Sequence, residues 1–307
     1  MGAGIYLSMM IVVNKEKVKK MLRRGLAFAL VIGLAAGYRV VNPGPESVKT
    51  MGADGEVTNW GLSFDKEGEP PVGNASAGDL AKYDAWYVGD TGKKTIYLTF
   101  DAGYENGYTA EILDVLKSHQ VPAAFFLVGT YIRDNPDLVK RMAEEGHIVG
   151  NHSMNHRDMS AVTDMAVFEK ELAEVEIAYQ SAIDDAADAD NGASPDKGKS
   201  GEKKVKMPRY YRPPEGKFSP NNLEMAKKLG YKTIFWSLAY VDWNTDRQPT
   251  REEALNTLLP RTHNGAVILL HSTSKTNAKV LGELIERWKT EGYRFGTLDE
   301  LTKSAIE

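Results

Sequence analysis

The chain contains no cysteine, and this absence excludes several kinds of site. Disulfide bonds, cysteine-ligated zinc centres, thiol nucleophiles and a lipid anchor attached through cysteine cannot form. The sequence also has no strong surplus of one charge, because its formal net charge is −4 and its pI is near 6.0. There is therefore no electrostatic reason to expect nucleic acid as a partner. A chain of 307 residues is long enough to be held together by an apolar core alone.

No uncharged apolar run is long enough to cross a bilayer comfortably, and the strongest one lies near the N-terminus. It extends from Gly25 to Gly37 and follows a cluster of lysines and arginines between residues 15 and 24. This arrangement is typical of a secretory signal peptide cleaved after Gly37, and an uncleaved membrane anchor or a buried core helix are the alternatives. We therefore expect residues 1–40 to be a signal or anchor, and the protein to be exported to the cell wall or membrane surface.

Residues 41–93 are rich in glycine, proline, asparagine and serine, and they show little apolar periodicity. They predict a mostly irregular arm in which Trp60 and Trp86 pack on the domain that follows. A second unusual segment, 184–206, has almost no large apolar residue, an acidic first half and a basic second half. Such a segment cannot bury enough surface to order itself, which predicts a flexible surface insertion.

Between residues 94 and 302, short apolar runs alternate with segments that have a helical period. Strands that are apolar on both faces and alternate with helices predict a parallel sheet covered by helices. About seven such strands could close into a barrel or stay open, and their number favours a barrel. The predicted strands are 96–101, 123–128, 147–151, 209–212, 232–238, 266–271 and 293–296.

Polar residues follow the first and third of these strands. Asp101 ends its strand, and a carboxylate at the carboxyl end of a parallel strand is the usual place for catalysis, although a helix-capping aspartate would also fit. His152 and His156 come directly after the strand 147–151. If they lie on a helical turn, their spacing places both imidazoles on one face, where they can share a metal ion. Capping or surface histidines are the alternative.

Three more strand ends carry polar residues. Arg212 is followed by two prolines, which make the loop rigid, so that an arginine held there could keep Asp101 ionised and oriented. An ordinary proline-rich turn is the alternative. Asp242 follows one further strand and His271 ends another, and together they have the parts of an oriented general acid, although a structural histidine would also fit. Trp243 offers a flat apolar wall of the kind that sugar rings favour. Because the carboxyl ends of parallel strands share one face, we expect all these residues to converge.

The set of motifs resembles one known family. In chain order, they are TFDAGYENG, NHSMNH, RPPEG, DW and LLHS. They are similar to the five motifs of the polysaccharide deacetylases (NodB homology, carbohydrate esterase family four), and the resemblance covers residues 94–302. The flanking sequence looks most like the sporulation branch, whose members deacetylate N-acetylmuramic acid in peptide-free peptidoglycan on the way to the muramic δ-lactam of spore cortex. The resemblance implies a distorted (β/α) barrel with about seven parallel strands, and peptidoglycan glycan strands as the partner.

The resemblance also implies roles for the residues. Asp101 would be the general base, oriented by Arg212, and His271 would be the general acid, tuned by Asp242. The divalent metal, usually zinc, would be held by His152 and His156. The substrate would be bound by Trp243, by Tyr211 and by the backbone N–H of Glu215, which would help to stabilise the oxyanion.

The sequence departs from the family at Ala102. Most members have an aspartate there as the third protein ligand of the metal, and the sporulation branch commonly has asparagine. A weakened, more hydrated metal site is therefore expected, with recruitment of Glu105 or a metal-free reaction as alternatives. Three other functions stay open: an N-acetylglucosamine or chitin-type deacetylase, an acetylxylan esterase, and a catalytically impaired glycan-binding module. The last is disfavoured because Asp101, Arg212 and His271 are all present.

Overall fold

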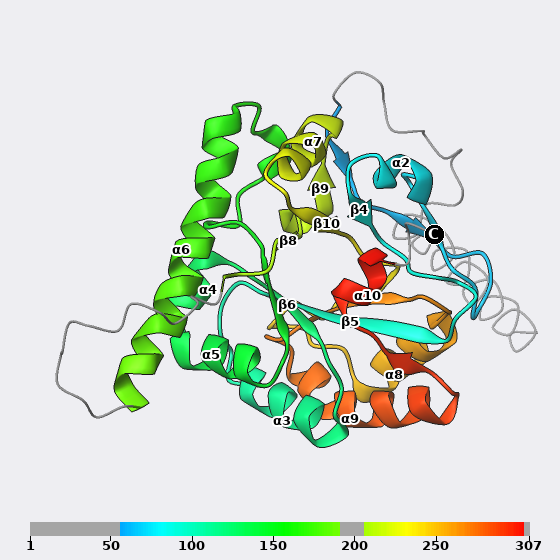
Figure 1. Cartoon of the computed structure of the whole chain (residues 1–307). Coiled ribbons are helices and arrows are strands. Elements are labelled where there is room, and N and C mark those ends of the chain that lie inside the picture. The colour runs from blue at the N-terminus through cyan, green and yellow to red at the C-terminus, as the bar shows by residue number, and fades with distance from the viewer. Residues whose placement is uncertain (1–55, 191–205, 304–307) are drawn as a thin grey trace, which may run out of the picture. The chain divides into compact units, whose positions relative to one another are not determined.

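A curled sheet forms the centre of the structure, a computed structural model that describes residues 56–190 and 206–303 (Figure 1). The predicted signal or anchor (1–40), residues 41–55 of the arm and residues 191–205 of the insertion lie outside the described residues. The strands of the central sheet are β4 (Ala85–Trp86), β5 (Thr95–Ala102), β6 (Ala124–Leu127), β7 (Ile148–Asn151), β8 (Tyr210–Tyr211), β10 (Lys232–Ile234), β11 (Leu238–Ala239), β12 (Val267–His271) and β13 (Arg294–Phe295).

All strand pairings within this sheet are parallel, and their order is β11-β12-β5-β6-β7-β8-β10-β4, with β13 beside β5. Strands β10 and β11 belong to one continuous segment, Lys232–Ala239. Its first half pairs with β8 and its second half with β12, and between them the amide of Ser237 donates to the carbonyl of Val267 at 2.9 Å. The segment therefore connects β12 at one side of the sheet with β8 at the other, and this curls the sheet. The predicted distorted (β/α) barrel is confirmed.

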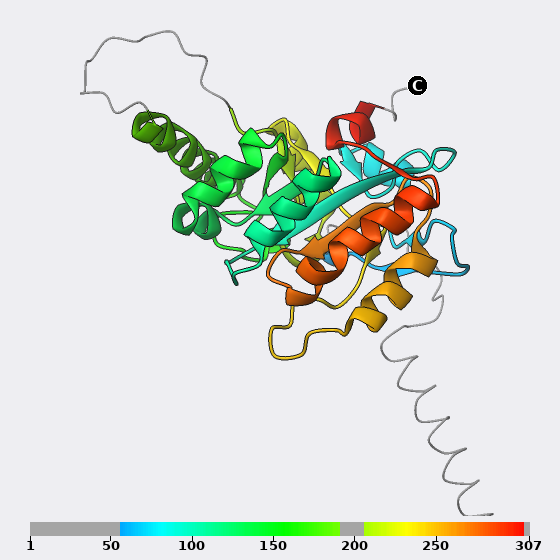
Figure 2. The same cartoon turned by 90° about the horizontal axis from the view of Figure 1, so that it is seen from below.

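Alternation along the strands separates two apolar layers. Tyr97 packs with Phe126 and Tyr210 inside the curl, whereas Leu98 and Phe100 pack with the helices outside it. The helices are α2 (Ala77–Ala81), α3 (Thr109–His119), α4 (Gly129–Asp134), α5 (Pro136–Glu144), α6 (Met165–Asp190), α7 (Pro220–Lys228), α8 (Arg251–Arg261), α9 (Lys275–Thr290) and α10 (Leu298–Lys303). Figure 2 shows α3, α9 and α8 side by side on the outside of the sheet. Among the described residues, no helix is both long and apolar enough to cross a membrane.

Helix α6 corrects the predicted boundary of the insertion. It continues to Asp190, so residues 184–190 are helical and do not belong to a loop. The segment lacks large apolar residues, but its alanines are strong helix formers and can extend a helix that is already nucleated.

The arm is more regular than the sequence predicts. Its described part contains β1 (Thr58–Asn59), β2 (Leu62–Ser63), β3 (Val72–Gly73) and α2, and β4 joins the edge of the central sheet beside β10. Strands of two residues are too short to show an alternating apolar pattern, so the sequence did not predict these strands. Trp60 is 8% exposed and stacks on Phe235 at a ring distance of 4.7 Å, while Trp86 packs against the apolar cluster inside the curl. The expected packing of these two tryptophans is confirmed.

The arm also braces one loop at the carboxyl ends of the strands. Strand β1 pairs with β9 (Lys217–Phe218), and the amide of Trp60 donates to the carbonyl of Gly216 at 3.0 Å. Gly216 has φ = 67°, and a Cβ there would lie 2.7 Å from the ring of Trp236. The turn that follows Arg212 is therefore held from both sides.

Candidate active site

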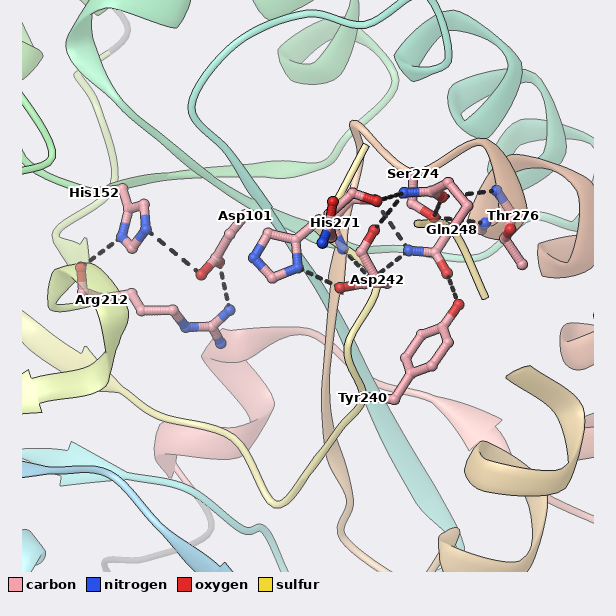
Figure 3. A network of polar contacts seen from close by, with 11 residues as sticks. Asp101, His152, Arg212, Tyr240, Asp242, Gln248, His271, Ser274 and Thr276 are labelled. Carbon is pink, nitrogen blue, oxygen red and sulfur yellow. Dashed lines mark hydrogen bonds and ion pairs between the residues drawn. The ribbon is translucent and has the colours of Figure 1, made fainter. Parts of the chain in front are cut away.

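Asp101 lies at the centre of the site, near the end of β5 (Figure 3). It is 6% exposed, and its Oδ1 accepts a hydrogen bond from Nη1 of Arg212 at 2.7 Å. Its Oδ2 lies 3.6 Å from Nε2 of His152. On the neighbouring strand, His271 is its pairing partner. Four of the predicted residues from four different strand ends therefore meet here, counting Asp101 itself.

Arg212 is completely buried, and each of its three guanidinium nitrogens donates a hydrogen bond. Besides Asp101, it donates from Nε to the carbonyl of Ile234 at 2.9 Å and from Nη2 to the carbonyl of Phe235 at 3.3 Å. Its charge also lies 4.2 Å from the ring centre of Phe126. Because a buried charge is costly unless it is paired and hydrogen-bonded, these contacts fix the side chain in one position. Arg212 is therefore placed and fixed so that it can orient Asp101, as the predicted role requires.

The neighbouring charges decide the protonation of Asp101. Burial alone would raise the pKa of this carboxyl, but the opposing effects, led by the bonded guanidinium of Arg212, outweigh burial and hold the pKa below its usual range. Asp101 is therefore an ionised carboxylate at neutral pH, which is the form that can accept a proton from water.

His152 is buried, and its tautomer follows from its partners. Its Nδ1 lies 2.8 Å from the carbonyl oxygen of Arg212, which can only accept, so Nδ1 carries the proton. Nε2 then presents its lone pair on the side of Asp101. Burial lowers the pKa of His152 to about 4, despite the opposing effect of Asp101. The ring is thus neutral, the form that binds metal ions.

The structure brings His152 and His156 together, but by a different route from the predicted one. Their ring centres are 4.9 Å apart in an edge-to-face arrangement. The backbone from Ser153 to His156 is not helical, since Ser153 and His156 have φ values of 64° and 51°. The expectation of a helical turn is therefore wrong. A loop with two left-handed residues brings the two imidazoles together instead, and it is His152 that lies beside the carboxylate of Asp101.

The donor set is suited to a metal ion that keeps part of its water. His152 and His156 offer two imidazoles, while Ala102 is 1% exposed and offers no ligand atom. Glu105 is already used, because its carboxylate accepts hydrogen bonds from the Gly107 amide at 2.6 Å and the Tyr131 hydroxyl at 3.0 Å. The alternative in which Glu105 is recruited is therefore not supported. Within residues 56–190 and 206–303, no group of three or more acidic or histidine side chains lies close enough to hold a metal.

His271 and Asp242 form the opposite side of the site. Nδ1 of His271 lies 2.7 Å from Oδ1 of Asp242, and the His271 amide donates to Oδ2 at 2.8 Å. Burial alone would lower the pKa of His271, but Asp242 outweighs it and raises the pKa above its ordinary value of 6.5, with a smaller contribution from Asp101. Trp243 is 53% exposed, and its ring centre lies 5.5 Å from that of His271. The predicted acid, its carboxylate and the aromatic wall are thus brought together.

Two predicted substrate-binding residues lie in different surroundings. Glu215 is exposed in the turn after Arg212, where it has φ = 57°, and its carboxylate pairs with Lys217 at 2.7 Å. Tyr211 is fully buried and packs edge-on against Phe168 at a ring distance of 5.9 Å. Adjacent strand residues face opposite sides, so Tyr211 faces the helix layer when Arg212 faces the site. Its predicted role in substrate binding is wrong.

Sequence reasoning missed a set of polar residues around Asp242, which Figure 3 shows beyond His271. Asn277 donates to the Asp242 carboxylate, and Gln248 donates to the Asp242 carbonyl at 3.0 Å and accepts from Ser274 at 2.7 Å. These side chains tie the loop that carries Trp243 to the start of α9. No sequence signal could have found them, because asparagine and serine at the start of a helix are ordinary capping residues.

The chain is similar to known proteins in sequence and in structure. The family model described as polysaccharide deacetylase matches residues 88–189. The peptidoglycan-N-acetylmuramic acid deacetylase PdaA of Bacillus subtilis is 40% identical over 80% of this chain and 86% of its own length. This chain belongs to the polysaccharide deacetylase family. The solved structure of Bacillus subtilis PdaA, a family 4 carbohydrate esterase, matches at a TM-score of 0.72 and 38% identity, over 82% of this chain and 100% of that one.

Two further relatives show the range of proteins that resemble this chain. An uncharacterized 30.6 kDa protein of Geobacillus stearothermophilus is 45% identical over 79% of this chain and 84% of its own length. A peptidoglycan-N-acetylglucosamine deacetylase of Bacillus cereus is 32% identical over 72% of this chain and 93% of its own length. The predicted family and the enzyme class, a hydrolase acting on carbon–nitrogen bonds, are confirmed.

Proposed function

We propose that this polysaccharide deacetylase is a metal-assisted hydrolase that removes N-acetyl groups from the amino sugars of peptidoglycan, with N-acetylmuramic acid as its substrate. The observation that carries the proposal is the pairing of Asp101 and His271 on adjacent strands, each held by a partner of opposite charge. Hydrolysis of an amide needs a base for water and an acid for the poor leaving group, and this arrangement supplies both on one strand-end face.

Asp101 is the base in this proposal. It is ionised, its second oxygen is not bonded to Arg212, and Arg212 prevents it from rotating. It takes a proton from the attacking water and holds it near the developing amine. The turn at Glu215 is fixed by Pro213 and Pro214, so its backbone N–H can be aimed at the carbonyl oxygen that becomes negatively charged.

His152 and His156 would hold the divalent metal, for which zinc is the proposed identity. Such an ion polarises the acetyl carbonyl and lowers the pKa of bound water. The chain contributes neutral imidazoles and a fixed ring orientation, through the contact of His152 with the carbonyl of Arg212. With Ala102 in the third ligand position, we expect the metal to be held weakly.

His271 is the acid for the departing amine. Asp242 keeps it protonated to higher pH than an ordinary histidine and fixes its Nδ1, which leaves Nε2 to deliver the proton. Trp243, exposed beside His271, provides an apolar face for the sugar ring. This arrangement has no clear use in a protein that only binds glycan, which argues against the impaired module.

Support for muramic acid over glucosamine comes from the higher identity with PdaA, at 40% against 32% for the Bacillus cereus glucosamine enzyme. The test is incubation with peptide-free peptidoglycan, with and without added metal, followed by mass spectrometry of the digested glycan. Loss of one acetyl group from muramic acid is expected, with the Asp101→Asn variant as the inactive control. Loss of acetyl groups from glucosamine alone would instead support an N-acetylglucosamine deacetylase. Glycan binding without acetate release would support the impaired glycan-binding module.

We also propose that the protein is exported and acts at the cell wall, in the spore cortex if it belongs to sporulation. The proposal rests on the basic cluster and the uncharged run from Gly25 to Gly37. Fractionation of cells and N-terminal sequencing of the mature protein test it. A mature chain starting at Tyr38 indicates a cleaved signal, an intact one in the membrane fraction indicates an anchor, and an intact cytoplasmic protein contradicts export.

A further inference from the structure

The carboxylate of Asp242 is held at both oxygens in a fully buried position. Oδ1 faces Nδ1 of His271 at 2.7 Å. Oδ2 accepts two hydrogen bonds, one from the His271 amide at 2.8 Å and one from Nδ2 of Asn277 at 2.6 Å. The bond from Asn277 is the only one of the three in which the other partner is not His271 itself. It is therefore the contact that anchors the carboxylate to a different part of the chain, the first turn of α9.

Asn277 is itself fully buried and fixed on every side. Its Nδ2 also donates to the carbonyl of His271 at 3.0 Å, and its Oδ1 accepts from the hydroxyl of Tyr240 at 2.5 Å. The orientation of the amide is not ambiguous, because an ionised carboxylate and a carbonyl can only accept, so the NH₂ group must face Asp242 and His271. Tyr240 then has to donate to the amide oxygen, which locks that orientation.

We propose that Asn277, oriented by Tyr240, is a positioning residue that holds Asp242 in line with His271 and so keeps His271 ready to protonate the leaving amine. The inference rests on the proposed role of His271 as the acid. Neither residue touches the reacting atoms. Asn277 acts through Asp242, and Tyr240 acts through Asn277.

The chemistry explains why an amide stands at this position. A carboxylate at residue 277 would put two like charges within hydrogen-bond distance, and an apolar side chain would leave Oδ2 with the His271 amide as its single donor. The carboxylate could then turn away from Nδ1 of His271. The charged groups that act on His271 are Asp242, Asp101 on β5 and Arg212, which directly follows β8. Asp101 and Arg212 are bonded to one another, so a change at Asn277 alters only the contribution of Asp242.

The test compares wild type with Asn277→Leu, which keeps the volume and removes the donors, and with Tyr240→Phe, which removes one hydroxyl. We expect Asn277→Leu to lower kcat about tenfold, a fraction of the 10²- to 10⁴-fold that a general acid contributes, with KM unchanged. The alkaline limb of the pH–rate profile should move to lower pH, and Tyr240→Phe should shift it in the same direction by less. NMR titration of the His271 ring, assigned with His271→Gln, measures the same shift without substrate or metal.

Ser274→Ala is the matched control for a purely structural effect. Ser274 caps α9, and its hydroxyl accepts a hydrogen bond from the backbone N–H of Asn277 at 3.2 Å, but it does not contact the Asp242 carboxylate. The control should lower Tm without moving the titration of His271. An equal shift in Ser274→Ala, or an unchanged His271 titration in folded Asn277→Leu, overturns the inference. If Asn277→Leu does not fold, the titration of Tyr240→Phe decides alone, and an unchanged value there overturns it.

The same data separate this inference from the proposed function. If the His271 titration shifts as expected while the wild-type enzyme releases no acetyl group from any glycan, the positioning role stands and the proposed function fails. If the wild-type enzyme deacetylates muramic acid and the titration does not move, the proposed function stands and the positioning role fails.

Discussion

Asp101 and His271 are register partners on the neighbouring parallel strands β5 and β12. Paired residues on adjacent parallel strands project to the same side of a sheet, at a strand spacing of about 4.8 Å. The carboxylate and the imidazole therefore lie side by side at the strand ends, and each is paired with a further residue, Asp101 with Arg212 and His271 with Asp242. In the proposed reaction, an acetamide bound over the strand ends meets the base and the acid at these two neighbouring positions.

Removing either group should nearly abolish turnover. We expect Asp101→Asn and His271→Ala each to lower kcat by about 10²- to 10⁴-fold, the usual contribution of a general base or acid. Acetate release from peptide-free peptidoglycan measures the effect, and circular dichroism checks that the variants are folded. If both folded variants turn over at the wild-type rate, the assignment of base and acid is wrong.

Arg212 should matter for folding as well as for activity. In Arg212→Met, the Asp101 carboxylate stays buried without its partner, and the carbonyls of Ile234 and Phe235 lose their donors. Breaking a buried ion pair in this way costs about 3–5 kcal/mol of unfolding free energy. Arg251→Met is the control, because that arginine is 59% exposed in its pair with Glu283 and should cost only about 0–1 kcal/mol. Urea denaturation compares the two, and equal losses would contradict the buried role of Arg212.

The pH profile should depend on Asp242. Its charge raises the pKa of His271 against the opposing effect of burial, so the acid stays protonated to higher pH than an ordinary histidine. In Asp242→Asn, the alkaline limb of kcat should therefore move to lower pH. Because the folded-state pKa is raised, the stabilisation by the pair is fully present below the ordinary pKa of 6.5 and is lost as pH rises through the folded-state value. The difference in unfolding free energy between wild type and variant should shrink over that range, and a constant difference would contradict it.

Metal dependence should be present but weak. With two imidazoles and no ligand from Ala102, dialysis against a chelator should remove the metal easily and lower the rate, and added zinc, manganese or cobalt should restore it. His156→Ala should lose the response to added metal. Bound metal is measured by elemental analysis before and after dialysis. Full activity in the presence of chelator would instead support the metal-free reaction.

Substitution of two aromatic residues should affect the kinetic constants differently. Trp243 is 53% exposed beside His271, so Trp243→Ala should raise KM about fivefold to tenfold, equivalent to about 1–1.4 kcal/mol, with a smaller change in kcat. Tyr211→Phe should leave both constants unchanged, because the buried Tyr211 hydroxyl has no hydrogen-bond partner among the described residues. Steady-state kinetics on the same glycan distinguish them, and a KM effect in Tyr211→Phe would show that Tyr211 does contribute to substrate binding.

Much of the site could be predicted because of one rule of parallel sheets. Asp101, His152, Arg212, Asp242 and His271 each follow an apolar run, and the carboxyl ends of parallel strands must share a face. What could not be predicted depends on local backbone geometry and side-chain direction. The left-handed residues Ser153 and His156 replace the expected helical turn, and the alternation of β8 turns Tyr211 into the helix layer.

The sequence alone determined which chemical groups this protein can use. It fixes the types and order of the polar residues at the strand ends, the absence of cysteine and the absence of a third ligand at Ala102. None of these features depends on how far apart the residues lie in the folded chain. Only the tertiary structure decided which groups act on one another. The closing of the sheet through Lys232–Ala239, the strand β4 from the arm and the contact of Asn277 with Asp242 all join residues far apart in the chain. Such contacts are set by packing and hydrogen-bond geometry in three dimensions, and no local pattern in the sequence encodes them.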